Sequence, residues 1–223
     1  MSAFADIKNF LDLNFSKTAV FFVIFYLVGI AGIVIPFSFP LFVKLIPYAL
    51  ILSSVALVFY HKSFDTKTII VFISIYLTGF FVEVTGVNTG LIFGQYYYGE
   101  SLGLKVFNTP LIIGLNWLLL VYLTASVLES SNTAVPVKIV ISALLMLGYD
   151  LIIEQIAPLL NMWNWQSNLI PVKNYLSWFL LALVFHAAIQ VFRIKTKNKL
   201  APVILVCQVS FFLILLIYFK LSN

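Results

Sequence analysis

Three carboxylic acids lie inside long apolar stretches of the sequence, namely Glu83, Asp150 and Glu154. An ionisable side chain in a membrane span costs several kcal/mol, so by default it faces the protein interior and marks a functional site. Asp150 and Glu154 are four residues apart, which places both on one face of a helix. These three acids are therefore the candidate catalytic residues.

The positions of the acids along their helices predict that they share one layer. At about 1.5 Å per residue, Glu83 lies roughly 24 Å from the start of its helix, and Asp150 and Glu154 lie roughly 21 and 27 Å from the start of theirs. Asn116, in a helix of the opposite direction, reaches the same depth. We expect these four polar side chains to form a single site beneath the long loop 88–109.

Aromatic side chains from two loops border this layer. The loop 88–109 carries Tyr96 and Tyr98, and the segment NMWNWQSNLIP carries Trp163 and Trp165. A glycine-containing loop of this length inside a compact protein is usually functional, and this one is a candidate lid. Tyrosine and tryptophan also gather at membrane interfaces simply as anchors, so both interpretations stay open here.

Carboxyl groups that are removed from water and share a site tend to retain a proton. Such a neutral acid can protonate an alkene if the resulting cation is tertiary, and an ionised partner can then orient water. Aromatic faces stabilise a nearby cation. The constellation suits acid-catalysed chemistry on a lipid-soluble isoprenoid, and it equally suits proton-coupled transport.

Structural explanations compete with these roles. Lys44, near the same end of its helix, is a possible ion-pair partner of Glu83. A hydrogen bond between helices would account for Asn116.

The histidines and a further acid give weaker signals. His186 is placed near mid-bilayer and reads as a core histidine, whereas His61 and Glu129 fall in loops and are expected to be solvated. No His-rich or Asp-rich metal spacing is present, so we expect no metal site.

The composition identifies the class of protein that must position these residues. Of 223 residues, 62% are hydrophobic and 9% charged, and the mean hydropathy is +1.08. A soluble domain carries about 25% charged residues, so this chain must face lipid. The net charge of +5 comes without a basic stripe, which argues against nucleic acid, and the single Cys207 excludes a disulfide within the chain.

Apolar runs long enough to cross a bilayer occur about seven times. The sequence therefore predicts an all-α integral membrane protein, a single domain over residues 1–223. The expected spans are Thr18–Ile35, Pro40–Tyr60, Lys67–Val87, Pro110–Leu128, Pro136–Ala157, Tyr175–Phe192 and Ala201–Phe219.

The distribution of lysine and arginine orients this bundle. Nine of these residues fall on the side of the N-terminus and four on the other side, which predicts a cytoplasmic N-terminus. The nine are Lys8, Lys17, Lys62, Lys67, Lys138, Arg193, Lys195, Lys197 and Lys199, and the four are Lys44, Lys105, Lys173 and Lys220.

Two known classes of seven-helix membrane protein do not fit. A retinal-binding rhodopsin needs a lysine in its seventh span, and 201–219 contains none. The paired three-helix halves of small sugar transporters, with their proline–glutamine signatures, are also missing. Transport by another fold stays open as an alternative.

An ordered set of motifs resembles one family of membrane proteins. The set comprises EVTGVNTGLIFGQYYY (83–98), Leu102-Gly103, Pro110-Leu111, Asn116-Trp117, DLIIE (150–154), WNW (163–165) and PVKN (171–174). It resembles the integral-membrane carotenoid hydratases of the carotenoid 1,2-hydratase and bisanhydrobacterioruberin hydratase type, over about half of the chain.

The resemblance implies a hydro-lyase that adds water across the terminal 1,2 double bond of an acyclic carotenoid and needs no cofactor. The implied partners are the carotenoid, the lipid bilayer of an inner or plasma membrane, and other carotenoid enzymes. Under this hypothesis one acid protonates carbon 2 and a second guides water to carbon 1. Asp150 is the first choice for the acid because it is the deeper of its pair. Asn116 holds the water, and the pocket is lined by Tyr96, Tyr98, Trp117, Trp163 and Trp165.

Overall fold

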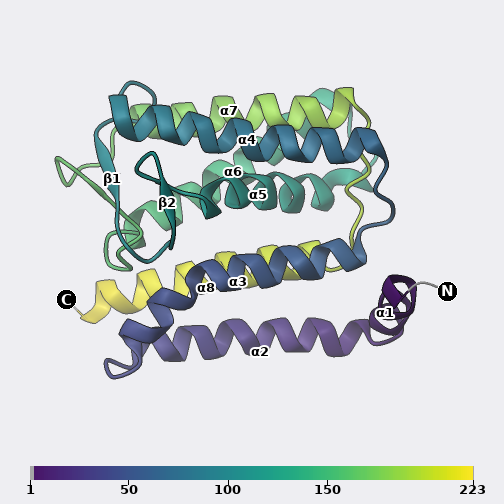
Figure 1. Ribbon diagram of the computed structural model, residues 1–223, viewed down its shortest axis with the longest axis horizontal. Helices are drawn as coiled ribbons and strands as arrows, with labels where there is room; N and C mark the ends of the chain where they lie inside the picture. Colours follow the sequence, from purple (N-terminus) through teal and green to yellow (C-terminus); the bar gives the residue numbers. More distant parts are fainter. Residues whose placement is uncertain (1–2, 223) are drawn as a thin grey trace.

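Seven long apolar helices run side by side in the computed structural model, which describes residues 3–222 (Figure 1). Each is long and apolar enough to cross a membrane, which confirms the predicted all-α integral membrane bundle. They are α2 (Phe15–Val34), α3 (Phe39–Tyr60), α4 (Thr66–Thr89), α5 (Ile112–Glu129), α6 (Val135–Ile156), α7 (Val172–Val191) and α8 (Ala201–Ser222).

The centre of the bundle is α5. Its residues from Leu119 to Ser126 are all buried, as expected for a helix that is surrounded by other helices. Figure 1 shows α5 and α6 between the pair α4 and α7 on one side and the pair α3 and α8 on the other, with α2 outermost.

Local sequence signals set the ends of α4. Asp65 caps its first turn, where the carboxylate accepts a hydrogen bond from the backbone N–H of Thr68 at 2.7 Å. Gly90 ends it with a φ of 67°, and the Gly90 N–H donates to the carbonyl of Gly86 at 2.8 Å. Glu83 is thereby held within the last two turns of α4.

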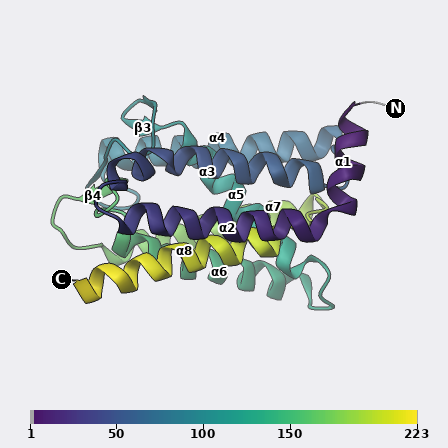
Figure 2. The same ribbon diagram turned by 90° about the horizontal axis from the view of Figure 1, so that it is seen from below.

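A short helix, α1 (Ala3–Leu13), crosses the N-terminal end of the bundle at a steep angle (Figure 2). The ammonium group of Lys8 donates a hydrogen bond to the carbonyl of His61 at the end of α3. Ile7, Phe10 and Leu13 are exposed, which suits a helix that lies along the membrane interface.

Two small sheets, absent from the predicted fold, cover the opposite end of the bundle. Strand β1 (Tyr96–Tyr98) pairs antiparallel with β4 (Trp163–Trp165), and β2 (Lys105–Val106) pairs with β3 (Thr109–Pro110). Pro110, the expected first residue of the fourth span, lies in β3, and the helix of that span begins at Ile112. The tight turn between β2 and β3 has positive φ at both central residues, 52° at Phe107 and 63° at Asn108.

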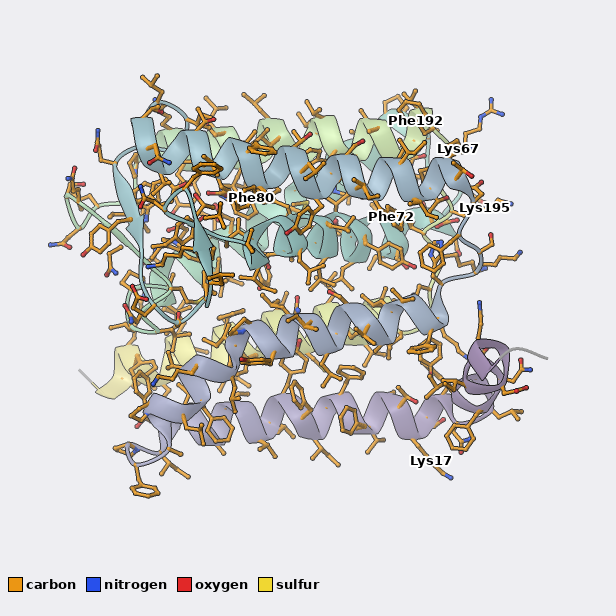
Figure 3. The ribbon with its side chains drawn as sticks, viewed as in Figure 1. Lys17, Lys67, Phe72, Phe80, Phe192 and Lys195 are labelled. Carbon is orange, nitrogen blue, oxygen red and sulfur yellow. The ribbon has the colours of Figure 1, made fainter. Side chains whose placement is uncertain are left out.

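The two ends of the bundle differ in charge. Figure 3 shows Lys17, Lys67 and Lys195 together at the end where the N-terminus lies, away from the strands. Successive helices run in opposite directions, so these basic residues lie on the side of the bundle to which the sequence count assigns them.

The charge asymmetry predicts that the strands and the C-terminus lie on the non-cytoplasmic side, because lysine and arginine are retained in the cytoplasm. A topology reporter fused after Lys220 should therefore report a non-cytoplasmic location, and a reporter in the loop before α4 a cytoplasmic one. A cytoplasmic signal from the first fusion would overturn the orientation.

Candidate active site

A small cavity lies where α4, α5, α6 and α7 meet the sheet formed by β1 and β4. Its volume is about 20 Å³, and its polar wall consists of Glu83, Asn116, Glu154 and Asn174. Aromatic rings supply most of the remaining wall, from Phe93, Tyr96, Tyr98, Trp117, Trp163, Trp165 and Trp178. The structure thus brings Glu83, Asn116 and Glu154 together, and all five predicted aromatic residues line the same cavity.

Glu83 accepts three hydrogen bonds from side chains. The hydroxyl groups of Tyr96 and Tyr98 donate to Oε2 at 2.6 and 2.8 Å, and the indole N–H of Trp117 donates to Oε1 at 3.0 Å. The Glu83 side chain is buried among these partners, whereas Lys44 is exposed on another face of the bundle. The possible ion pair with Lys44 is therefore not formed.

Glu154 accepts three hydrogen bonds as well, but from N–H donors alone. The indole groups of Trp163 and Trp165 donate to Oε2 at 3.1 and 2.7 Å, and the amide of Asn174 donates to Oε1 at 3.1 Å. The two indole groups cannot accept a hydrogen bond in return, and Asn174 presents its N–H side to Glu154. The surroundings of Glu154 therefore suit an ionised carboxylate.

Asp150 lies behind the cavity wall. Its side chain is fully buried, its Oδ2 accepts from the same Asn174 amide at 3.2 Å, and its Oδ1 has no partner within the described part of the chain. Asn174 thus joins the two acids of α6. The sequence reasoning gave Asn174 no role, although it is part of the PVKN motif and stands in the first turn of α7.

The sheet acts as a roof whose side chains alternate. Tyr96, Tyr98, Trp163 and Trp165 are buried toward the acids, while Tyr97 points away and is exposed. Burial, reinforced by the nearby Glu83, raises the pKa of Tyr96 and Tyr98 above that of a free tyrosine. Both hydroxyl groups therefore stay protonated and can donate to Glu83.

Stacked rings form the floor of the cavity. Trp117 and Trp178 lie 3.9 Å apart between ring centroids with an interplanar angle of 22°, and Phe185 meets Trp117 edge-on at 5.6 Å. Trp178 was not singled out in the sequence, because one tryptophan in an apolar helix carries no positional signal.

Asn116 faces the cavity without a fixed partner. Its side chain is 8% exposed and makes no hydrogen bond to any other described residue. The amide is therefore available to a molecule inside the cavity, and the alternative of a hydrogen bond between helices is not observed.

A family comparison adds independent information. The sequence model described as "Carotenoid biosynthesis protein" matches residues 43–222, which is most of the chain. The chain belongs to this family. The match includes every residue of the cavity and leaves α1 and α2 outside. No curated protein and no solved structure matches the chain.

Other polar residues of this carotenoid biosynthesis protein are structural. His186 is buried in the core, with Nε2 placed 3.1 Å from the hydroxyl of Thr124, as predicted. His61 was expected to be solvated, which was wrong. It is 2% exposed, its Nδ1 is 2.8 Å from the Tyr122 hydroxyl, and burial lowers its pKa. Glu129 is half-buried and accepts a hydrogen bond from Thr196 at 2.7 Å.

The close approach of α4 to α5 yields a test of the site's packing. A Cβ atom at Gly79 would lie 2.8 Å from both Cβ and Cγ of Trp117, while a Cβ at Gly148 would meet nothing within 4 Å. Alanine is better than glycine in a helix by up to about 1 kcal/mol, so Gly148→Ala should leave thermal stability equal or higher. Gly79→Ala should lower it and displace the indole of Trp117 from Glu83.

Thermal unfolding of the two variants in detergent, followed by tryptophan fluorescence, measures this difference. Equal unfolding temperatures for the two variants would show that the contact between Gly79 and Trp117 does not constrain the site.

Proposed function

We propose that this protein hydrates the terminal 1,2 double bond of an acyclic carotenoid and produces a tertiary alcohol. The observation that carries the proposal is the presence of two carboxyl groups, Glu83 and Glu154, in the wall of one aromatic cavity. About 10–15 Å³ suffices for one water molecule, so a cavity of about 20 Å³ has room for the second reactant. Membership of the carotenoid biosynthesis family supplies the substrate class.

Glu83 is the better candidate for the acid. Two of its three partners are tyrosine hydroxyl groups, which can accept a hydrogen bond as well as donate one, so they tolerate Glu83 in its protonated form. When Glu83 passes its proton to carbon 2, the alkene electron pair forms the new C–H bond. The carboxylate left behind is stabilised by the three donors already in place.

The role first assigned to Asp150 moves to Glu83 because Asp150 does not line the cavity. The hydrogen bonds that link Asp150 to Glu154 run through the shared amide of Asn174. Oδ1 of Asp150 has no partner in the described part of the chain. If it carries a proton, Asp150 and Glu154 together hold a single negative charge. We assign Asp150 a positioning role.

Glu154 is the candidate base that guides water. In this mechanism Asn116 holds the water molecule, its oxygen bonds to carbon 1, and the proton it releases passes to Glu154. The faces of Trp117 and Trp178 stabilise the intermediate cation through their ring quadrupoles. Transfer of that proton back to Glu83 through water returns the site to its starting state.

The cavity is too small to hold a carotenoid end group and water together. Binding therefore requires the aromatic wall to move. We assign this movement to the β1–β4 roof, because both strands lie in loops between helices. The lid role expected of the loop 88–109 thus becomes part of the proposal, with residues 163–165 as its second half.

The amides Glu83→Gln and Glu154→Gln keep the shape of the site but remove the transferable proton or the base. General acid–base catalysis contributes about 10²–10⁴-fold, so each variant should lose at least about 10²-fold in hydration. Asp150→Asn should lose less. Expression in a lycopene-producing host, followed by mass spectrometry of the pigments, measures the gain of one water.

Glu100→Gln is the matched control, because Glu100 is 84% exposed in a surface ion pair with Lys105 at 2.7 Å. Full activity of both cavity variants would rule out the acid–base mechanism. Unchanged pigment with the wild-type protein would instead favour proton-coupled transport by the same acids.

Isotopes distinguish hydration from oxidative routes to the same alcohol. In deuterium oxide one deuterium should appear on carbon 2, and in oxygen-18 water the new hydroxyl should carry the label, because water supplies both parts of the added molecule. Mass spectrometry of the product locates both labels. A hydroxyl labelled from molecular oxygen would refute the mechanism.

A further inference from the structure

Helices α2, α3 and α8 enclose a second cavity, on the part of the bundle away from the candidate active site. Its volume is about 120 Å³, and apolar side chains such as Phe42, Ala49 and Phe212 form nearly all of its wall. Val28 and Leu45 line it and are exposed on the outer surface, so the cavity opens toward lipid. We call it the α2–α3–α8 crevice.

One polar side chain in this crevice lacks a well-formed hydrogen bond to the rest of the described chain. Gln208 is 2% exposed, and neither its Nε2 nor its Oε1 forms a hydrogen bond with another described residue. The neighbouring hydroxyl of Tyr26 is paired with Ser53 at 3.0 Å and also interacts with the Gln208 side chain, but without hydrogen-bond geometry, so most of the bonding capacity of the amide stays unused. An unsatisfied amide in hydrocarbon is costly, so a native protein retains one where something else binds it.

The depth of Gln208 restricts what that partner can be. Gln208 follows Ala201, the first residue of α8, by seven positions, which corresponds to about 10 Å along the helix. Ser53 lies seven positions before the end of α3, at the same level. Glycerolipid headgroups and their ester groups stay near the interface, so the partner must carry its polar group into the hydrocarbon core on an apolar chain.

We propose that the α2–α3–α8 crevice binds a long isoprenoid alcohol whose hydroxyl group pairs with the amide of Gln208. An amide offers both donors and an acceptor, which a hydroxyl group can match with its own acceptor and donor. The apolar walls accept the hydrocarbon chain. Identifying the natural ligand as a carotenoid alcohol rests on the proposed function, which produces such an alcohol, but binding itself requires no turnover.

Photolabelling of the purified full-length protein in detergent tests the site. The probe is geranylgeraniol carrying a diazirine, and peptide mass spectrometry locates the label. We expect labelled residues on α2, α3 and α8 and competition by unmodified geranylgeraniol. The methyl ether of the probe, which cannot donate a hydrogen bond, should label the crevice less.

Two variants address the crevice by different means. Gln208→Leu removes the amide and should reduce labelling there by about five-fold or more, because one hydrogen bond corresponds to about that factor in affinity. Ala49→Phe fills the cavity without touching the amide and should reduce labelling similarly. Ser210→Ala, also on α8 but outside the crevice, should label like the wild type.

Several outcomes would overturn the proposal. These are unchanged labelling in Gln208→Leu, unchanged labelling in Ala49→Phe, equal labelling by the methyl ether, and competition by phospholipid alone.

Gln208→Leu should also unfold at the same or a higher temperature than the wild type. A lower unfolding temperature with labelling intact would show that the amide has a structural partner. If Gln208→Leu does not fold, the labelling of Ala49→Phe and the comparison of the probe with its methyl ether decide whether the crevice is the binding site. Glu83→Gln should retain labelling of the crevice, so failure of the hydratase proposal is recognised separately.

Discussion

The constraint on which the strand-covered end of the bundle depends is the burial of its carboxyl groups away from bulk water. In hydrocarbon a carboxyl group needs donors from the protein itself, and Glu83 and Glu154 each obtain three. Those donors come from β1, α5, β4 and α7. Satisfying the two acids of α4 and α6 therefore brings these four elements together at the cavity.

This constraint also explains why aromatic residues form the site. Tyrosine and tryptophan combine one polar atom with a large apolar body, so they satisfy a carboxylate without bringing further charge into the bilayer. In β1 and β4 the alternation of side chains places the polar atoms of these rings on the inner side of the sheet. The rings of Tyr96 and Trp165 face each other across the sheet, with 5.2 Å between their centroids. The same side chains that solvate the acids thus exclude bulk water from them.

Helical rise and hydropathy were enough to predict the spans and the layer of Glu83, Asp150, Glu154 and Asn116. They could not give the rotation of each helix about its axis, and so they did not show that Lys44 faces outward or that Asp150 lies behind Asn174. The pairing of β1 with β4 joins three-residue segments far apart in the chain, and such pairing is decided by tertiary packing. His61 was misjudged for a similar reason, since Tyr122 of the distant α5 covers it.

The position of the cavity at one end of the bundle has a consequence for a substrate with two equivalent ends. Under the proposed function, only the end of the carotenoid that reaches the strand-covered side would meet the acids, so each hydration would leave the new hydroxyl group at that membrane surface. A hydroxyl group at the interface resists passage through the hydrocarbon core. Hydration of the second end therefore requires the whole molecule to turn over in the bilayer, which would make single-ended alcohols accumulate before doubly hydrated ones.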